Sequence, residues 1–279
     1  MGLFDKIFGN KNKKNESVSQ NNENAVNNTN YNTYSTAKQV NNNSSSRGKV
    51  NLSKEESLKK INLRKEAVNK VCLAKKELTD LTARVAVVMD YSGSMDHLYY
   101  DGTVQSVLER LLPVALKFDD NGELETWIFE NKFNRLNDIN IDNYYGYIEN
   151  ENILRKYGMG GTNYAPVMRD VLKKYTVEDP ADIPTLVLFI TDGDNFDKKE
   201  ATKAIKEASN YPIFWQFVGL GNRSYSFLES LDEMEGRFVD NANFFAVDDI
   251  NKMSDDELYN KLLGEYPDWI RKARDLRLF

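Results

Sequence analysis

The sequence predicts an α/β fold: a doubly wound, mostly parallel sheet with helices on both faces. Three observations predict it. Short apolar segments rich in β-branched and aromatic residues recur along the chain, segments with helical spacing of apolar residues alternate with them, and two of the apolar segments end in acidic motifs. Strands that alternate with helices are joined by right-handed crossovers, which make the strands of such a sheet parallel.

The first 50 residues differ from the rest in composition. Residues 10–50 consist mainly of Asn, Ser, Lys and Thr, with too few large apolar side chains to offset the entropy of ordering, so we expect a disordered linker. Residues 1–9 form a short apolar island, too short for a stable helix on its own. This island is either a flexible start or a peptide that docks on a partner or, weakly, on a membrane surface.

Residues 51–80 are expected to form an N-terminal helix, over 54–79, that packs on the domain. Ser53 and Glu56 form a capping box before it. Apolar residues then recur at helical spacing: Leu58, Ile61, Val68, Val71, Cys72 and Leu78. This apolar stripe must be buried, and we interpret the Lys- and Arg-rich opposite face as a solvated surface.

Five strands are predicted within residues 81–279. The first, residues 83–89, is a nearly continuous β-branched run, which is typical of a strand buried on both faces. The other four strands are Leu124–Phe129, Thr185–Ile190, Ile213–Val218 and Phe244–Val247.

Helical patterns lie between and after these strands. The clearest is an apolar stripe from Val104 to Ala115, and shorter candidates occupy residues 164–175, 198–209 and 224–235. A second capping box, Ser254 with Glu257, begins a closing helix, and Pro267 begins a last short helix that ends near Arg274.

Composition excludes several kinds of site. Residues 1–80 hold 15 Lys and Arg against 8 Asp and Glu, and the whole chain has a formal charge of −6, so the remainder carries −13. An acidic globular part argues against a nucleic-acid partner and suits cation binding. One cysteine, Cys72, and one histidine, His97, exclude an internal disulfide and a Cys/His zinc site.

The sequence also bears on location. No apolar run is long enough to span a membrane, and the first residues lack the order of a signal peptide. We therefore expect a cytoplasmic protein.

Polar motifs follow two of the predicted strands. Asp90-Tyr91-Ser92-Gly93-Ser94 comes after the first strand, and Thr191-Asp192-Gly193-Asp194 comes after the third. In open α/β sheets ligands bind at the carboxyl ends of strands, and the glycine-rich loop Gly160-Gly161-Thr162 is flexible enough to approach them. The residues expected to converge are Asp90, Ser92, Ser94, Thr162 and Asp192.

These five side chains offer hard oxygens to one point, which selects Mg²⁺, with Mn²⁺ or Ca²⁺ as alternatives. We expect Ser92 and Ser94 to bind the ion directly, with Thr162 as a third candidate. Asp90 and Asp192 are expected to act through water or by orienting the hydroxyls. Because hydroxyls are neutral, the ion stays electrophilic, and a carboxylate from another protein can take a free coordination position.

Each motif alone is a weak signal, because such triplets occur in polar turns and helix caps. Neighbouring residues receive structural interpretations. Asp194 is read as a cap of the helix after it and His97 as an exposed loop residue. Several tyrosines either rim the site or pack in the core: Tyr99, Tyr100, Tyr144, Tyr145 and Tyr164.

Together, the motifs D-Y-S-G-S-M, G-G-T-N-Y-A-P and F-I-T-D-G-D resemble the metal-ion-dependent adhesion site of von Willebrand factor A (vWA) domains. Further segments resemble the TerF-like branch, which is linked to tellurite and toxic-cation resistance in bacteria; copines are more distant relatives. These segments are residues 63–66, 71–73, 214–219 and 239–245. The likeness covers roughly residues 55–275.

This resemblance implies a six-stranded sheet, whose remaining edge strand we place near Lys132–Asn137. It also implies the metal role of all five site residues, and partners among other toxic-cation-resistance components.

Three functions remain open from the sequence. The first is a non-catalytic, metal-dependent protein-interaction module. The second is a metal-assisted hydrolase or phosphatase that uses a site serine or a metal-bound water. The third is a divalent-metal sensor in a stress response. Loss of partner binding on chelation favours the first function, and Mg²⁺-dependent turnover of a phosphoester favours the second.

Overall fold

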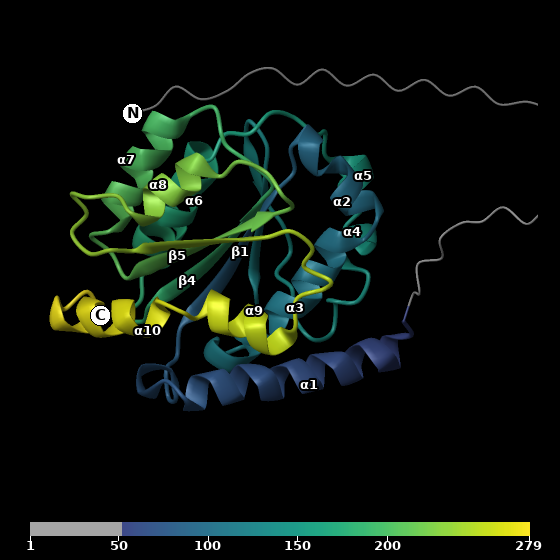
Figure 1. Cartoon of the computed structure of the whole chain (residues 1–279), viewed down its shortest axis with the longest axis horizontal. Coiled ribbons are helices and arrows are strands. Elements are labelled where there is room, and N and C mark those ends of the chain that lie inside the picture. The colour runs from purple at the N-terminus through teal and green to yellow at the C-terminus, as the bar shows by residue number, and fades with distance from the viewer. Residues whose placement is uncertain (1–51) are drawn as a thin grey trace, which may run out of the picture. The chain divides into compact units, whose positions relative to one another are not determined.

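Six strands form one sheet, in the order β3-β2-β1-β4-β5-β6, within a computed structural model that describes residues 52–279 (Figure 1). The strands are β1 (Arg84–Asp90), β2 (Glu125–Phe129), β3 (Phe133–Arg135), β4 (Thr185–Thr191), β5 (Ile213–Leu220) and β6 (Ala242–Val247). The island predicted at residues 1–9 and the linker predicted at 10–50 lie outside the described residues.

Five strands are parallel, and only β3 is antiparallel to its neighbour, β2. The predicted fold class is confirmed, and the edge strand lies where we placed it, near Lys132–Asn137. Short β3 leaves few unpaired backbone groups at that edge of the sheet.

Each central strand sends alternate side chains into two separate hydrophobic clusters, one on each face of the sheet. In β1, Val85 and Val87 pack into one cluster, and Ala86 and Val88 pack into the other. Such two-sided burial explains why the strand reads as a continuous apolar run instead of an alternating one.

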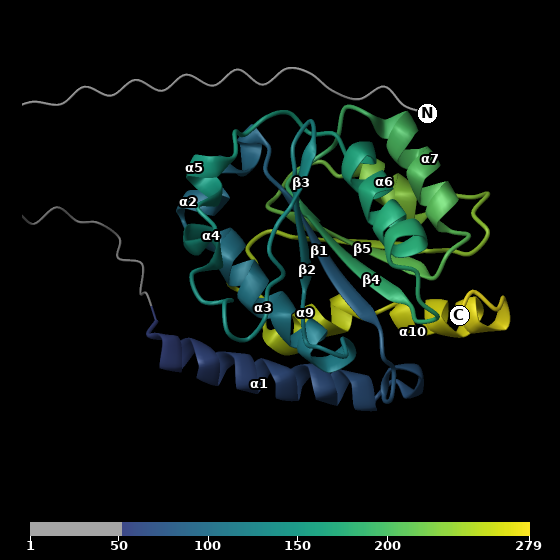
Figure 2. The same ribbon diagram turned by 180° about the vertical axis from the view of Figure 1, so that it is seen from behind.

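The helices divide between these faces (Figures 1 and 2). The first face is covered by α1 (Lys54–Leu73), α3 (Thr103–Phe118), α9 (Asp255–Leu262) and α10 (Tyr266–Asp275). The second face is covered by α6 (Ala165–Lys173), α7 (Lys198–Ala208) and α8 (Ser226–Asp232).

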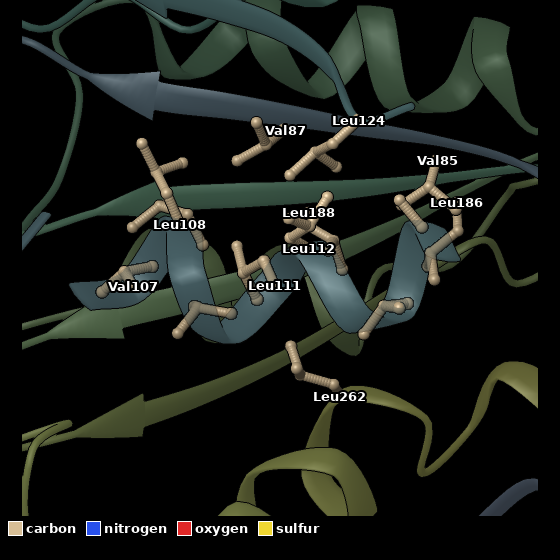
Figure 3. Close-up of a cluster of buried hydrophobic side chains, with 14 of the residues drawn as sticks. Val85, Val87, Val107, Leu108, Leu111, Leu112, Leu124, Leu186, Leu188 and Leu262 are labelled. Atoms are coloured by element: carbon tan, nitrogen blue, oxygen red, sulfur yellow. The ribbon is translucent and has the colours of Figure 1, made fainter. Parts of the chain in front are cut away.

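Helix α3 lies against the middle of the sheet, and its predicted apolar stripe packs against the strands (Figure 3). Val107, Leu108, Leu111 and Leu112 are buried in the same cluster as residues of β1 and β4. Burying one such side chain contributes about 1.5–3 kcal/mol, so this interface is a main source of stability.

Helix α1 begins as predicted, because the reciprocal capping box of Ser53 and Glu56 is present. It ends at Leu73, however, and not at residue 79. Lys75 is extended, and its Nζ donates to the carbonyl oxygens of Leu263 and Gly264 at 2.8 and 3.3 Å. This anchor turns the chain into a short 3₁₀ turn, Lys76–Leu78.

Helix α1 packs against α3 and α9. One member of its predicted stripe is placed wrongly: Leu58 is 39% exposed, whereas Ile61 and Val68 are fully buried. Within residues 52–279, no helix combines the length and apolar character needed to cross a membrane.

Several short elements had no counterpart in the prediction. They are the 3₁₀ turn Gly93–Met95, α2 (Asp96–Tyr100), α4 (Tyr147–Asn150), α5 (Ile153–Lys156) and a π-helical turn after α6, Lys174–Glu178. None is longer than five residues. A helical period repeats every 3.6 residues, so elements this short leave almost no periodic signal.

Candidate metal centre

Asp90 is the last residue of β1, and both oxygens of its fully buried carboxylate accept hydrogen bonds. Oδ1 accepts from the backbone N–H of Ser92 at 2.7 Å, and Oδ2 accepts from Oγ1 of Thr191 at 2.6 Å. Burial raises the pKa of Asp90 to about 6, although the hydrogen bonds from Thr191 and Ser92 lower it in part. Asp90 is thus tied both to its own loop and to the neighbouring strand.

The two serine hydroxyls carry this network to the second motif. Ser92 Oγ lies 3.1 Å from Ser94 Oγ, and Ser94 Oγ donates to Oδ1 of Asp192 at 2.7 Å. Asp192 directly follows β4, which pairs with β1 in parallel register. The parallel pairing therefore brings both acidic motifs to the same edge of the sheet, as the sequence predicted.

The third predicted segment, residues 160–163, is bound to three neighbouring loops. Gly160 O accepts from Gly93 N at 3.0 Å, and Thr162 O accepts from Phe196 N at 2.9 Å. Asn163 N donates to Glu130 O, after β2, at 2.9 Å. These three backbone bonds fix the position of Thr162.

Glycine is needed here for close approach. A Cβ on Gly160 would lie 2.3 Å from Oε2 of Glu130, and one on Gly161 would lie 2.6 Å from Oδ1 of Asn131. The two glycines therefore let the loop pass beside the turn that follows β2.

Three of the five predicted residues, Ser94, Thr162 and Asp192, line a cleft of about 510 Å³. Its other lining residues are Gly193, Asp194, Phe196, Arg223 and Ser224. Asp90 and Ser92 are buried and connected to Asp192 and Ser94 by the hydrogen bonds above. The structure thus brings all five residues together.

Asp192 differs from Asp90 in having a buried oxygen, Oδ2, with no hydrogen-bond partner among residues 52–279. Nη2 of Arg223 lies 3.2 Å from that oxygen, within ion-pair distance but outside hydrogen-bond geometry. A buried acceptor beside three hydroxyls is the kind of donor set that a hard divalent cation completes. These residues therefore fit Mg²⁺, Mn²⁺ or Ca²⁺.

Other acidic clusters do not compete for this role. In the described part of the chain, no group of three or more His, Cys, Asp or Glu side chains is arranged to hold a metal ion. Of the two predicted carboxylates, an ion at the cleft would face Asp192, which lines it, while Asp90 is buried outside the lining; the other three predicted residues offer neutral hydroxyls.

Thr191 and Tyr164 support the site in a way that the sequence analysis missed. The hydroxyl of Tyr164 donates to Thr191 Oγ1 at 3.1 Å, and Thr191 Oγ1 donates to Asp90. Tyr164 is fully buried against Phe129 and Phe189, so it supports the site from below instead of rimming it. Of the other tyrosines considered, Tyr99 donates to the carbonyl oxygen of Asp90 at 3.0 Å.

The structure corrects the interpretation of Asp194. Its carboxylate pairs with Lys198 Nζ at 2.6 Å and accepts from Phe227 N, in the first turn of α8, at 3.3 Å. It does not cap the backbone of α7, the helix that follows it. Asp197 instead accepts from the N–H groups of Tyr164 and Ala165, at the start of α6, at 2.9 and 2.7 Å.

With this geometry in place, comparison with known proteins identifies the family. A family model described as the vWA domain found in the C terminus of TerF matches residues 82–278. The chain belongs to the TerF-like vWA family.

Two curated relatives show how far this likeness extends. The chain is 46% identical over 208 residues to the uncharacterized protein YcbR of Bacillus subtilis (strain 168), covering 74% of this chain and 85% of YcbR. It is 32% identical over 106 residues to Copine-C of Dictyostelium discoideum, covering 36% of this chain and 19% of Copine-C.

The chain is also similar to solved vWA structures. They include the ArnB paralog VWA2 from Sulfolobus acidocaldarius, with a TM-score of 0.39 and 14% identity. The von Willebrand factor type A protein from Catenulispora acidiphila has a TM-score of 0.46 and 13% identity. The matches cover 68% and 69% of this chain, which spans less than half of the two solved chains, 44% and 43%.

Proposed function

We propose that this TerF-like vWA domain is a metal-ion-dependent protein-interaction module and not an enzyme. Asp90, Ser92, Ser94, Thr162 and Asp192 would hold Mg²⁺, with Mn²⁺ or Ca²⁺ as alternatives, and an acidic group of a partner protein would complete the coordination. The observation that carries this proposal is Oδ2 of Asp192, a buried carboxylate oxygen without a hydrogen bond beside a hydroxyl-lined cleft.

The charges around the cleft support an ion that can still bind another acid. Two carboxylates balance a divalent charge, and the three hydroxyls add none. The ion would keep its attraction for a further anion, and Mg²⁺ commonly leaves part of its coordination to ligands from outside the protein.

The rim of the cleft supports protein binding. Phe196 lines the cleft and is 81% exposed, even though its backbone N–H is fixed by Thr162 O. Aromatic side chains are enriched in protein interfaces, and a large apolar ring that is exposed to water gains free energy from being covered.

A hydrolase would need a base placed against a serine hydroxyl. Among residues 52–279, the one histidine, His97, makes no hydrogen bond to a serine hydroxyl, and its Nδ1 lies 3.0 Å from the backbone carbonyl oxygen of Ser94. No observation favours the hydrolase or the sensor over the interaction module.

Membership of the TerF-like family supports a cytoplasmic stress response to tellurite or other toxic cations, with partners among the other components of that response. The acidic charge of residues 81–279 supports a protein partner over a nucleic acid. Direct reduction of tellurite by this domain has no support from its thiol. Cys72 is buried, and burial raises the pKa of the thiol to about 11, so very little reactive thiolate forms at neutral pH. The role we propose is therefore one of assembly.

A capture experiment tests the proposal. The full chain, Asp192→Asn and the charge-matched Asp268→Asn, which changes an exposed carboxylate in α10, are immobilised and incubated with a bacterial lysate in Mg²⁺ or EDTA. We expect proteins retained by the wild type and by Asp268→Asn in Mg²⁺ and released by EDTA, with none retained by Asp192→Asn. Retention of the same proteins in EDTA and by Asp192→Asn would refute the proposal.

A further inference from the structure

Arg223 is the cation of this site, and it comes from outside the three predicted motifs. It lies in the loop between β5 and α8, and its side chain is 46% exposed, whereas its counter-ion Asp192 is buried. An arginine placed this way touches the buried acidic group and can also reach a molecule that enters the cleft.

The loop that carries Arg223 is braced. The hydroxyl of Tyr225 donates to the carbonyl oxygens of Leu220 and Gly221 at 2.7 and 3.0 Å. The ring of Tyr225 lies so close to Gly219 that a Cβ there would come within 2.7 Å of it. Gly221 has a φ of +88°, which few other residues adopt. The backbone of the loop is thus fixed, and the mobile part of Arg223 is its long side chain.

The contact between Arg223 and Asp192 is incomplete. The two groups are 3.2 Å apart, yet Oδ2 of Asp192 receives no hydrogen bond from any residue that the structure describes. An arginine–carboxylate pair is strongest when two N–H groups donate in parallel, and that arrangement is not made here. The guanidinium can therefore leave Asp192 at little cost once another cation neutralises the carboxylate.

A divalent ion would change the sign of the local charge. Asp90, Asp192 and Arg223 together have a formal charge of −1, and a bound divalent ion makes it +1. The neighbouring Asp194 does not alter this balance, because Lys198 pairs with it at 2.6 Å. The metal-free cleft therefore repels an anion, and the loaded cleft attracts one.

We propose that Arg223 couples ion loading to recognition of an acidic ligand. In the metal-free chain it neutralises Asp192 and so competes with the ion. In the loaded chain it is displaced from Asp192 and binds the ligand's carboxylate together with the ion, since the guanidinium fork matches a carboxylate. This inference rests on the proposed function, and it identifies the ligand as an aspartate or glutamate side chain of a protein.

The test uses Mn²⁺ as the ion and acetate as the carboxylate probe. Mn²⁺ affinity of the full chain is measured by calorimetry in chloride and in acetate at equal ionic strength, with free Mn²⁺ corrected for acetate binding. The variants are Arg223→Gln and Arg271→Gln. The second makes the same substitution at an arginine of similar exposure, 54%, which pairs with Asp268 in α10 and does not line the cleft.

In the wild type we expect acetate to raise Mn²⁺ affinity at least about twofold, because coupling between two ligands is reciprocal. Arg223→Gln should bind Mn²⁺ about three- to fivefold more tightly in chloride, because the ion no longer competes with an ion pair whose arginine is about half exposed. Acetate should not raise the Mn²⁺ affinity of this variant further. Arg271→Gln should keep the acetate gain.

Two outcomes separate this inference from the function on which it rests. Absence of saturable Mn²⁺ binding in the wild type would refute the metal site and the inference with it. Mn²⁺ binding without an acetate gain, or an acetate gain that Arg223→Gln retains or that Arg271→Gln also loses, would overturn the coupling role of Arg223 while leaving the metal site standing.

Discussion

Asp90 and Asp192 occupy equivalent places at the ends of two paired strands, yet their surroundings differ. Both oxygens of Asp90 accept hydrogen bonds from within the domain, whereas Asp192 has one bonded oxygen and one that receives no hydrogen bond from residues 52–279. Asp90 does not line the cleft, and Asp192 does. The first carboxylate organises the loop, and the second provides an unsatisfied acceptor at the cleft.

This difference follows from where the partners come from. Asp90 is bonded by its own turn and by Thr191 on the adjacent strand, so folding of the sheet satisfies it automatically. Asp192 is met by Ser94 from the other motif and by Arg223 from a more distant loop. The site thus combines one carboxylate, Asp90, whose hydrogen bonds are fixed by the fold, with a second, Asp192, that can exchange partners.

The largest expected effect comes from removing the charge of either site carboxylate, Asp90 or Asp192. Asp90→Asn and Asp192→Asn should each lower Mg²⁺ affinity at least about 100-fold, because each removes one of the two charges that balance the ion. Asp268→Asn, an exposed carboxylate in α10, is the matched control and should bind as the wild type does. Calorimetry measures all three, and undiminished binding in either site variant would contradict the proposed ligand set.

A pH series on the metal-free protein tests how the burial of Asp90 affects the free energy of unfolding. Burial raises its pKa from 3.8 to about 6, so its contribution to stability is fully present below pH 4 and is lost as the pH rises through about 6. The loss is about 3 kcal/mol, by 1.36 kcal/mol per pKa unit. Asp90→Asn cannot ionise there and should escape this loss.

Urea unfolding in EDTA between pH 4 and pH 7 measures this effect. The free energy of unfolding of the wild type, measured relative to that of Asp90→Asn, should fall by about 3 kcal/mol from pH 4 to pH 7. Asp268→Asn is the control for the loss of an exposed carboxylate. Parallel pH curves for the wild type and Asp90→Asn would show that burial of Asp90 carries no such cost.

Thr191→Val removes the hydroxyl that joins Tyr164 to Asp90 while keeping the shape of the side chain. We expect a loss of about 1–3 kcal/mol in the free energy of unfolding, since Oδ2 of the buried Asp90 is left without its donor. The hydroxyl of Tyr164 keeps its hydrogen bond to Gly193 O. Ion affinity should fall about 10- to 100-fold, the usual cost of losing a group that orients a ligand.

Thr185→Val is the control for this change, at the buried start of the same strand. The role assigned to Thr191 would fail if the two valine variants had equal stability and equal ion affinity.

The smallest expected effect concerns the loop that carries Arg223, the ion-pair partner of Asp192. Gly219→Ala would press a Cβ into the buried ring of Tyr225 and shift the loop that carries Arg223. Overpacking of this kind costs about 1–3 kcal/mol, which thermal or urea unfolding detects. Gly158→Ala, where an added Cβ meets nothing within 4 Å, should change little. Equal stability of the two alanine variants would show that the loop is not braced through Gly219.

The sequence predicted those parts of the fold that leave a periodic or compositional signal. Strands β1, β2, β4 and β5 were found because they are buried on both faces, and α3 was found because its apolar stripe runs over four turns. The edge strand β6 was found from its short aromatic and apolar run, although it is only partly buried. The edge strand Phe133–Arg135 has only three residues, and only the family resemblance indicated it. Helices of four or five residues, such as α4 and α5, left no usable period.

For the site, the sequence identified the three motifs and the edge of the sheet at which they meet. It did not identify Arg223, because a lone arginine in a loop is read as a solvated side chain unless its neighbour across space is known. It also assigned a cap to Asp194 within its own segment, whereas Asp194 and Asp197 bond the starts of α8 and α6. These are contacts between distant segments, which no local pattern encodes.

The proposed metal site is tested by titration of Mg²⁺ into the full chain by calorimetry, beside Asp192→Asn. We expect saturable binding at one site in the wild type and its loss in the variant. Absence of saturable binding in the wild type, or the same binding in Asp192→Asn, would contradict the proposed site.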